Sequence, residues 1–207
     1  MSKYRGKYNH RQVHPKIYVF FHTEKDELEY FKNYKNHLES HLLIPKKAVF
    51  GDPCKLIDFL IEWKKGNINP DDGDMLWFVF DIDDFYCSNL VNSIKKANKN
   101  EIKVAFSNEC FELWILLHFQ KPSGAILRKD LGNKIRENIK GFKKGQNVFD
   151  LIIDKQDQAV KNAKALLKCP YEKIDWNLFL SKKGNPSTSL HFLIEIINKN
   201  NQKRYYV

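Results

Sequence analysis

Three aspartates at the end of an unbroken apolar run are the residues best suited to chemistry. Asp81, Asp83 and Asp84 close residues 75–80, which are apolar without alternation, as in a strand buried on both faces of a parallel sheet. Open α/β sheets place ligands at this carboxyl edge, and side chains two positions apart share one side of an extended chain. Paired carboxylates there favour a divalent cation, which neutralises their repulsion. An acidic turn that caps the next helix is the alternative interpretation.

Two further acids follow the first predicted strand, residues 17–21: Glu24 directly and Glu27 one helical turn later. If the first and third strands are neighbours, as in the order 2-1-3-4, Glu24 and Asp81 converge at the switch point of the sheet. With Asp83 they would form an all-oxygen site suited to Mg²⁺ or Mn²⁺. Taken alone, Glu24 and Glu27 are equally typical of first-turn acids favoured by the helix dipole.

Glu112 and His118 lie in residues 109–119, a predicted buried helix that residues 107–108 could cap. A buried carboxylate is costly, so Glu112 must be paired, protonated or placed at the helix edge facing the sheet. A structural pairing is at least as consistent with the sequence as catalysis, and we expect His118 to be a hydrogen-bonded core histidine.

Residues 182–188 combine positive charge, a glycine and hydroxyls before a predicted helix, with Asn185 as N-cap and Pro186 at the first helical position. Backbone N–H groups, hydroxyls and cations together make a reasonable phosphate site. The predicted nucleic-acid contacts are Lys182, Lys183, Asn185, Ser187 and Thr188. A capped helix after a basic loop is the alternative.

The 207-residue chain carries 35 Lys and Arg against 25 Asp and Glu, a net charge of +10. Such a surplus favours polyanions, above all nucleic acid, through counterion release and steering. The four cysteines are scattered, so we expect neither a disulfide framework nor a zinc site, and a reduced cytoplasmic protein. No signal peptide or membrane-spanning run is found in the sequence.

Strand and helix patterns alternate in the first half, which predicts a mostly parallel four-stranded α/β sheet flanked by helices, before a helical second half. We expect a basic flexible arm over residues 1–16 and one domain over 17–207, with a sheet core at 17–120 and a helical extension at 121–207. The predicted strands are residues 17–21, 47–50, 75–81 and 102–106, and the main predicted helices are 25–41, 55–64, 89–97, 109–119, 154–168 and one opening at 185.

Three motifs in this order resemble the RloB-like family of phage-defence proteins, which have a Toprim-like (Rossmann-like) fold. They are FDIDDF at 80–85, SNECFELWILLHF at 107–119, the most specific, and NPSTSLH at 185–191. The resemblance implies that a strand-one Glu and the strand-three DxD acids hold Mg²⁺ for phosphodiester cleavage of DNA or RNA. It also implies an ABC/AAA-type ATPase partner in an abortive-infection or restriction-linked system. A homo-oligomer is compatible with it.

The family's first motif resembles C-E-G-E-K-T-E, whereas residues 21–27 read FHTEKDE, with His22 at the usual general-base position. Either Glu24 takes over as the catalytic acid, or this member is a weak or inactive nuclease that acts as a regulatory module on the ATPase. His22 keeps the capacity to ligate a metal or act as a base. The candidate catalytic residues are Glu24, Glu27, Asp81 and Asp83, the candidate metal ligands Glu24, Asp81 and Asp83, and the further candidates His22, Asp84 and Glu112.

Overall fold

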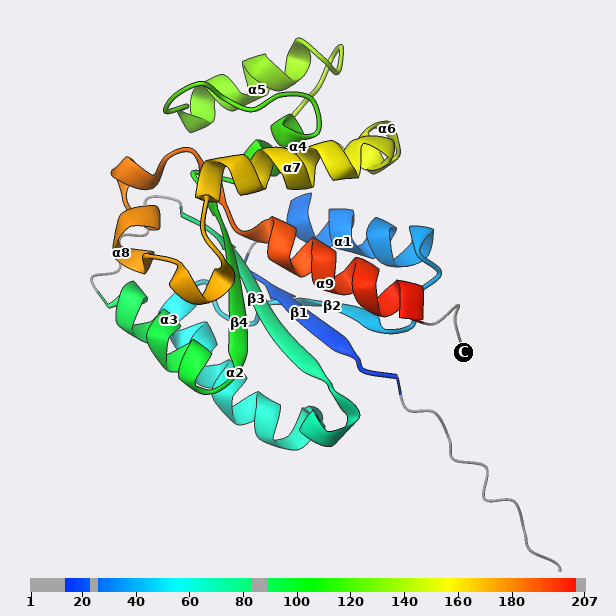
Figure 1. Cartoon of the computed structure of the whole chain (residues 1–207), viewed down its shortest axis with the longest axis vertical. Helices are drawn as coiled ribbons and strands as arrows, with labels where there is room; N and C mark the ends of the chain where they lie inside the picture. The colour runs from blue at the N-terminus through cyan, green and yellow to red at the C-terminus, as the bar shows by residue number, and fades with distance from the viewer. Residues whose placement is uncertain (1–13, 23–25, 83–88, 204–207) are drawn as a thin grey trace, which may run out of the picture.

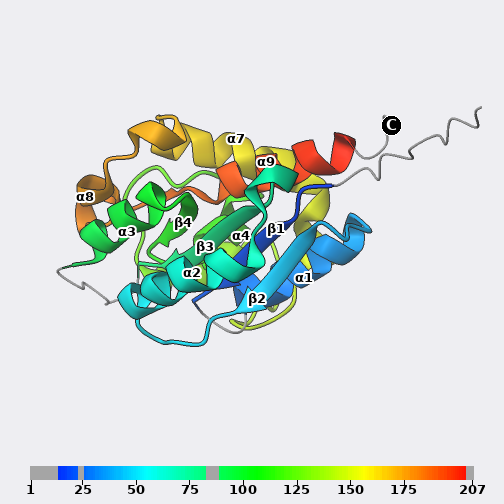
Figure 2. The ribbon, with the colours of Figure 1, turned by 90° about the horizontal axis from the view of Figure 1, so that it is seen from below.

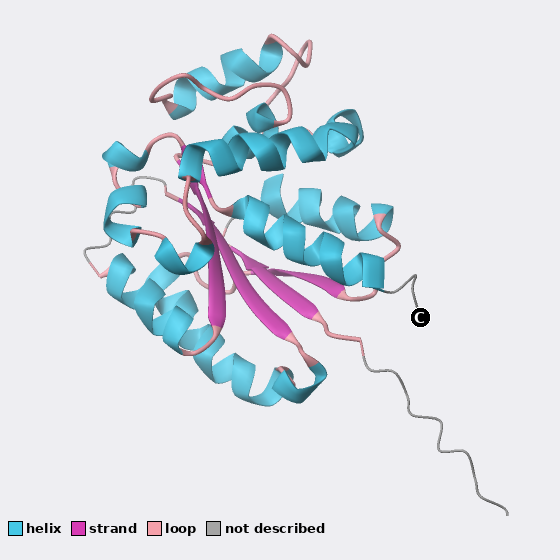
Figure 3. Ribbon diagram, viewed as in Figure 1, coloured by secondary structure: helices cyan, strands magenta, loops and turns pink. Residues whose placement is uncertain are grey.

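A five-stranded sheet in the order β2-β1-β3-β4-β5 forms the centre of the molecule (Figure 3). The computed structural model describes residues 14–22, 26–82 and 89–203. The first four strands in this order are parallel and β5 is antiparallel to β4. The α/β class and the predicted order 2-1-3-4 are confirmed, and a short fifth strand is added. The strands are β1 (Ile17–Phe21), β2 (Leu43–Lys47), β3 (Met75–Asp81), β4 (Ile102–Asn108) and β5 (Ser187–Thr188).

Helices cover both faces of the sheet (Figures 1 and 2). Alternate strand residues supply the two cores: Phe21 packs with α1, α4, α7 and α9, whereas Phe20 packs with α2, α3 and α8. The α-helices are α1 (Asp26–His37), α2 (Pro53–Asn67), α3 (Leu90–Lys99), α4 (Glu112–Leu117), α5 (Arg128–Arg136), α6 (Phe149–Ile152), α7 (Gln156–Leu167), α8 (Trp176–Phe179) and α9 (Leu190–Lys203). Short 3₁₀ turns are η1 (Pro70–Asp72), η2 (Ile153–Lys155), η3 (Tyr171–Lys173) and η4 (Lys182–Gly184). None of the helices in the described part of the chain is long and apolar enough to cross a membrane.

The predicted second strand was placed too late in the chain. The strand is Leu43–Lys47 rather than residues 47–50, and it contains Pro45. A proline cannot donate to the ladder, but β2 is the edge strand of the sheet, where proline is tolerated. Val49 and Phe50, whose β-propensity suggested the strand, are exposed beyond its end.

The last helix also begins later than predicted, at Leu190, so Asn185 and Pro186 are not its N-cap and first residue. Ser187 and Thr188 instead pair with Asn108 and Ser107 as β5. The helix α4 also begins later than predicted, at Glu112 rather than at residue 109, because residues 107–108 continue β4 instead of capping the helix.

Hydroxyl groups from the C-terminal part of the chain cover the outer edge of β4. The Tyr171 hydroxyl lies 2.7 Å from the backbone N of Val104 and 3.1 Å from its carbonyl oxygen. At Phe106, the backbone N–H donates to Ser189 Oγ at 3.0 Å, and the carbonyl accepts from Thr188 Oγ1 at 2.8 Å. These side chains satisfy backbone groups that a further strand would otherwise pair.

Candidate functional site

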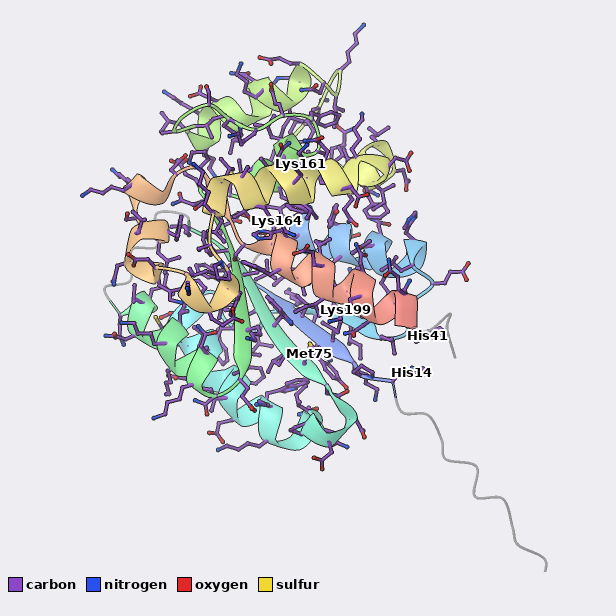
Figure 4. The ribbon with its side chains drawn as sticks, viewed as in Figure 1. His14, His41, Met75, Lys161, Lys164 and Lys199 are labelled. Carbon is purple, nitrogen blue, oxygen red and sulfur yellow. The ribbon has the colours of Figure 1, made fainter. Side chains whose placement is uncertain are left out.

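Asp81 ends the central strand β3, flanked by β1 and β4. The backbone N–H of His22, just past β1, donates to Val79 at 2.9 Å, and that of Ile82 donates to Ser107 in β4 at 3.0 Å. The carboxyl ends of three parallel strands therefore meet around Asp81, whose side chain is only 6% exposed. Figure 4 marks the opposite, amino end of the sheet with Met75 at the start of β3.

Arg128, the first residue of α5, provides a positive charge to this buried carboxylate. Its Nη2 lies 3.8 Å from Asp81 Oδ2, a distance typical of an ion pair rather than of a charge-assisted hydrogen bond. The arginine side chain is 40% exposed. Arg128 was not identified as a site residue from the sequence, because it lies 47 positions after Asp81 and outside the three motifs.

A second ion pair joins Glu112, the first residue of α4, to Lys144 in the loop between α5 and α6. Lys144 Nζ lies 3.3 Å from Glu112 Oε1, and the two side chains are 63% and 7% exposed. Burial acts to raise the pKa of Glu112, but hydrogen bonds from Cys110 and the backbone, with the charge of Lys144, hold the pKa below its ordinary value. Of the alternatives open for Glu112, the structure shows the paired one, and the lowered pKa favours the ionised form.

The buried thiol of Cys110 lies between the two ion pairs. Burial is the main cause that raises the pKa of Cys110, and the charges of Glu112 and Asp81 add to it. Burial is the largest single cause acting on the pKa of Lys144 and acts to lower it, as does the charge of Arg128. The charge and hydrogen bond of Glu112, together with Cys110, nevertheless raise this pKa overall. The two carboxylates and two cations thus form one four-charge cluster around a neutral thiol.

Two motif residues hold the N-terminus of α5, and with it Arg128, in place. Glu109 Oε2 accepts from the backbone N of Arg128 at 2.6 Å, and Glu109 Oε1 accepts from Asn185 Nδ2 at 3.1 Å. Asn185 also bonds both the N–H and the carbonyl of Ile126, each at 3.0 Å. Two motifs 76 positions apart, at Glu109 and Asn185, therefore cooperate to position the arginine.

The remaining candidate residues fall into two groups, those outside the described part of the chain and those with a defined place in the fold. Glu24, Asp83 and Asp84 lie outside the described residues. Glu27 is buried in the first turn of α1, at 2% exposure. The imidazole of His22 donates from Nε2 to the Gly51 carbonyl at 2.7 Å, since a carbonyl can only accept. The His118 ring is buried, with Nδ1 2.9 Å from the Trp114 carbonyl, as expected of a core histidine.

The predicted phosphate-binding segment divides into an exposed and a buried part. Lys182 and Lys183 are exposed on η4, whereas Ser187 and Thr188 are fully buried in β5. Gly184 serves close packing rather than flexibility: a Cβ there would lie 2.5 Å from the Cα of Phe179. Only the two lysines are thus displayed to solvent as cations for a polyanion.

We expect replacement of Lys182 and Lys183 by Ala to weaken nucleic-acid binding for all sequences alike. Each lost phosphate contact should reduce the slope of log affinity against log salt by about 0.9 on duplex or about 0.7 on a single strand. Binding titrations over a salt series measure this slope. The double variant Lys161→Ala/Lys199→Ala, on α7 and α9 (Figure 4), is matched in charge. An unchanged slope in the Lys182/Lys183 variant would show that the segment makes no phosphate contact.

Of the three predicted metal ligands, Asp81 is the one that lies within the described residues. Within residues 14–22, 26–82 and 89–203, no three or more His, Cys, Asp and Glu side chains are grouped to hold a metal ion. Asp81, a hard oxygen ligand buried at the switch point, fits a divalent cation by its chemistry. The placement of the other two predicted ligands, Glu24 and Asp83, stays a prediction.

A hollow of about 250 Å³ lies beside the cluster, between the start of α1 and residues 145–149. Phe111 and Gly145, in its lining, are the direct neighbours of Glu112 and Lys144. Pockets that enclose drug-sized molecules measure about 300–1,000 Å³, so this hollow is small for engulfing a ligand of that size.

The sheet order, the helices on both faces and the buried acid at the switch point define an α/β protein with a polar site at the carboxyl edge of its sheet. The chain belongs to the RloB-like protein family, whose family model matches residues 17–197. A search of curated proteins and one of solved structures found no match.

Proposed function

We propose that this protein is a Mg²⁺-dependent nuclease of the Toprim type that cleaves phosphodiester bonds in a bacterial anti-phage system, together with an ATPase partner. The observation that supports it most is the buried carboxylate of Asp81 at the carboxyl end of the central strand. Membership of the RloB-like family and the net charge of +10, which favours a polyanion, support the same proposal.

In this proposal Asp81, with Glu24 and Asp83, holds Mg²⁺ or Mn²⁺. A metal bound there supplies charge stabilisation at the phosphate oxygens and a lower pKa for the attacking water. The chain contributes the fixed position of Asp81, which three strand ends and the Arg128 ion pair restrict. Glu27, buried one turn into α1, is the further acid proposed for the reaction.

A regulatory module that docks on the ATPase without cutting is the second candidate. The observation that favours it is His22, which stands where the resemblance implies a general-base Glu and whose Nε2–H is engaged by the Gly51 carbonyl. With Nε2 as the donor, only Nδ1 of a neutral ring is left to accept a proton or bind a metal.

Incubation with plasmid DNA and with total RNA, in Mg²⁺, Mn²⁺ or EDTA and with or without the ATPase encoded nearby, distinguishes the two candidates. A nuclease yields products in the metal-containing reactions and none in EDTA. Calorimetric titration with Mn²⁺ alone adds a measurement that does not depend on activity. Lack of both cleavage and Mn²⁺ binding would exclude the nuclease and leave the regulatory module.

A further inference from the structure

Two cations at the carboxyl edge come from a part of the chain that supplies none of the proposed metal ligands. Arg128 begins α5 and Lys144 lies in the loop that follows it, whereas the acids they meet, Asp81 and Glu112, are on β3 and α4. The acids are 6% and 7% exposed, but the cations are 40% and 63% exposed. Each pair therefore presents its positive member to solvent.

Neutralisation of two buried acids does not by itself require this arrangement. Exposed ion pairs contribute about 0–1 kcal/mol to stability, and buried ones stabilise a fold only where close, hydrogen-bonded geometry offsets the cost of desolvation. The 3.8 Å separation of Arg128 from Asp81 is longer than a hydrogen bond. The position of the arginine is nevertheless well defined, because hydrogen bonds with Glu109 and Asn185 fix the backbone at the start of α5.

Arg128 and Lys144 are also close enough to oppose each other electrostatically. Burial and, to a smaller extent, the charge of Arg128 act to lower the pKa of Lys144, against the larger combined effect of Glu112 and Cys110. An oxyanion between two such cations would relieve their repulsion. A guanidinium suits this role, since its planar fork of donors matches a phosphate, and an ammonium adds a point charge.

We propose that Arg128 and Lys144 form a phosphate clamp that holds the backbone of the nucleic-acid substrate against Asp81, an inference that rests on the proposed nuclease function. In the protein without substrate, the ion pairs with Asp81 and Glu112 hold the two cations in position. The clamp does not include Lys182 and Lys183 on η4, so its phosphate contacts add to any that these lysines make.

The test is a double-mutant cycle of binding to a fluorescent oligonucleotide duplex, measured in EDTA so that cleavage plays no part. The clamp proposal predicts that Asp81→Asn releases the Arg128 side chain to bind a phosphate and so strengthens binding of the duplex. In an Arg128→Gln background this gain disappears, whereas in a Lys129→Gln background it persists, because Lys129 is an exposed neighbour of the same charge. Separately, Arg128→Gln/Lys144→Gln flattens the salt slope by about 1.8, from about 0.9 per phosphate contact, and Lys129→Gln/Lys143→Gln leaves it unchanged.

Equal gains from Asp81→Asn in all three backgrounds would overturn the clamp, because they would reflect general repulsion by the aspartate alone. So would equal slope changes in the Arg128/Lys144 variant and its Lys129/Lys143 control. In either case a wild type that still cleaves DNA or RNA with Mg²⁺ keeps the nuclease proposal intact. A wild type that neither binds nor cleaves overturns both.

Discussion

Asp81→Asn is expected to reduce Mg²⁺-dependent cleavage by about a thousandfold or more while leaving nucleic-acid binding intact or stronger. The amide is a poor ligand for a divalent cation, and loss of roughly 4 kcal/mol of charge stabilisation in the transition state corresponds to this factor. Binding does not suffer, because the substitution removes negative charge beside the phosphate path. Initial cleavage rates and affinities in EDTA, from the same preparations, measure the two effects separately.

Asp58→Asn is the matched control, since Asp58 is an exposed aspartate on α2 that pairs with Lys96. It should cleave at the wild-type rate. Asp83→Ala, at a position outside the described residues, is expected to behave like Asp81→Asn. If Asp81→Asn cuts as fast as the wild type with Mg²⁺ present, the acids after β3 are not the metal site.

The second large effect that we expect is a loss of folding stability as the pH falls below about 6.5. Burial is the main cause that lowers the pKa of both His118 and His191 to about 4, with Lys155 acting in the same direction at the first and Lys164 at the second. Backbone carbonyls near both rings, and Glu195 near His191, act in the opposite direction. The unfolded chain takes up these two protons near pH 6.5, but the folded chain does so only near pH 4.

The contribution of these histidines is therefore fully present above about pH 6.5 and is lost as the pH falls towards 4. A shift of this size corresponds to about 3 kcal/mol for each histidine, a large share of the stability of a typical domain. Urea unfolding at a series of pH values between 7 and 4.5 measures the slope, before most carboxylates titrate.

Substitutions separate the histidines from other groups. His118→Asn can retain the donor to the Trp114 carbonyl but cannot be protonated, so it should flatten the pH dependence, and so should His191→Gln. The exposed His41, replaced by Gln, controls for the loss of an imidazole as such. Unfolding slopes identical to wild type in both buried variants would rule out the two histidines as the source.

The sheet was predictable because strand burial leaves a direct pattern in the sequence. Residues 75–80 are apolar at every position, and the structure buries β3 on both faces between the two helical layers. The alternation of strands and helices predicted a parallel sheet, and the order 2-1-3-4, taken from the doubly wound arrangement, agrees with the structure. The edges were harder to predict: β2 contains Pro45, and the two residues of β5 are too few to show any period.

The site was predictable only where its residues adjoin a strong strand. Asp81 ends a run that fixes its place in the sheet, and Glu112 lies in an apolar helix where its burial demanded a partner. Arg128 and Lys144 belong to none of the sequence motifs, and α5 and the following loop are held by contacts that only the folded chain reveals. One clue was present: Arg128 is an arginine in a chain whose cations are mostly lysine.

The hydroxyls along the outer edge of β4 limit how this protein can join a partner. Proteins often dock by adding a strand to an open sheet edge, which needs free backbone donors and acceptors. The backbone groups of Val104 and Phe106 are already hydrogen-bonded to the hydroxyls of Tyr171, Thr188 and Ser189. This edge of β4 is therefore closed to strand addition. On the β2 side, Pro45 removes one donor from the ladder. We therefore expect the proposed ATPase partner to dock through helix surfaces and loops rather than by extension of the sheet at β4.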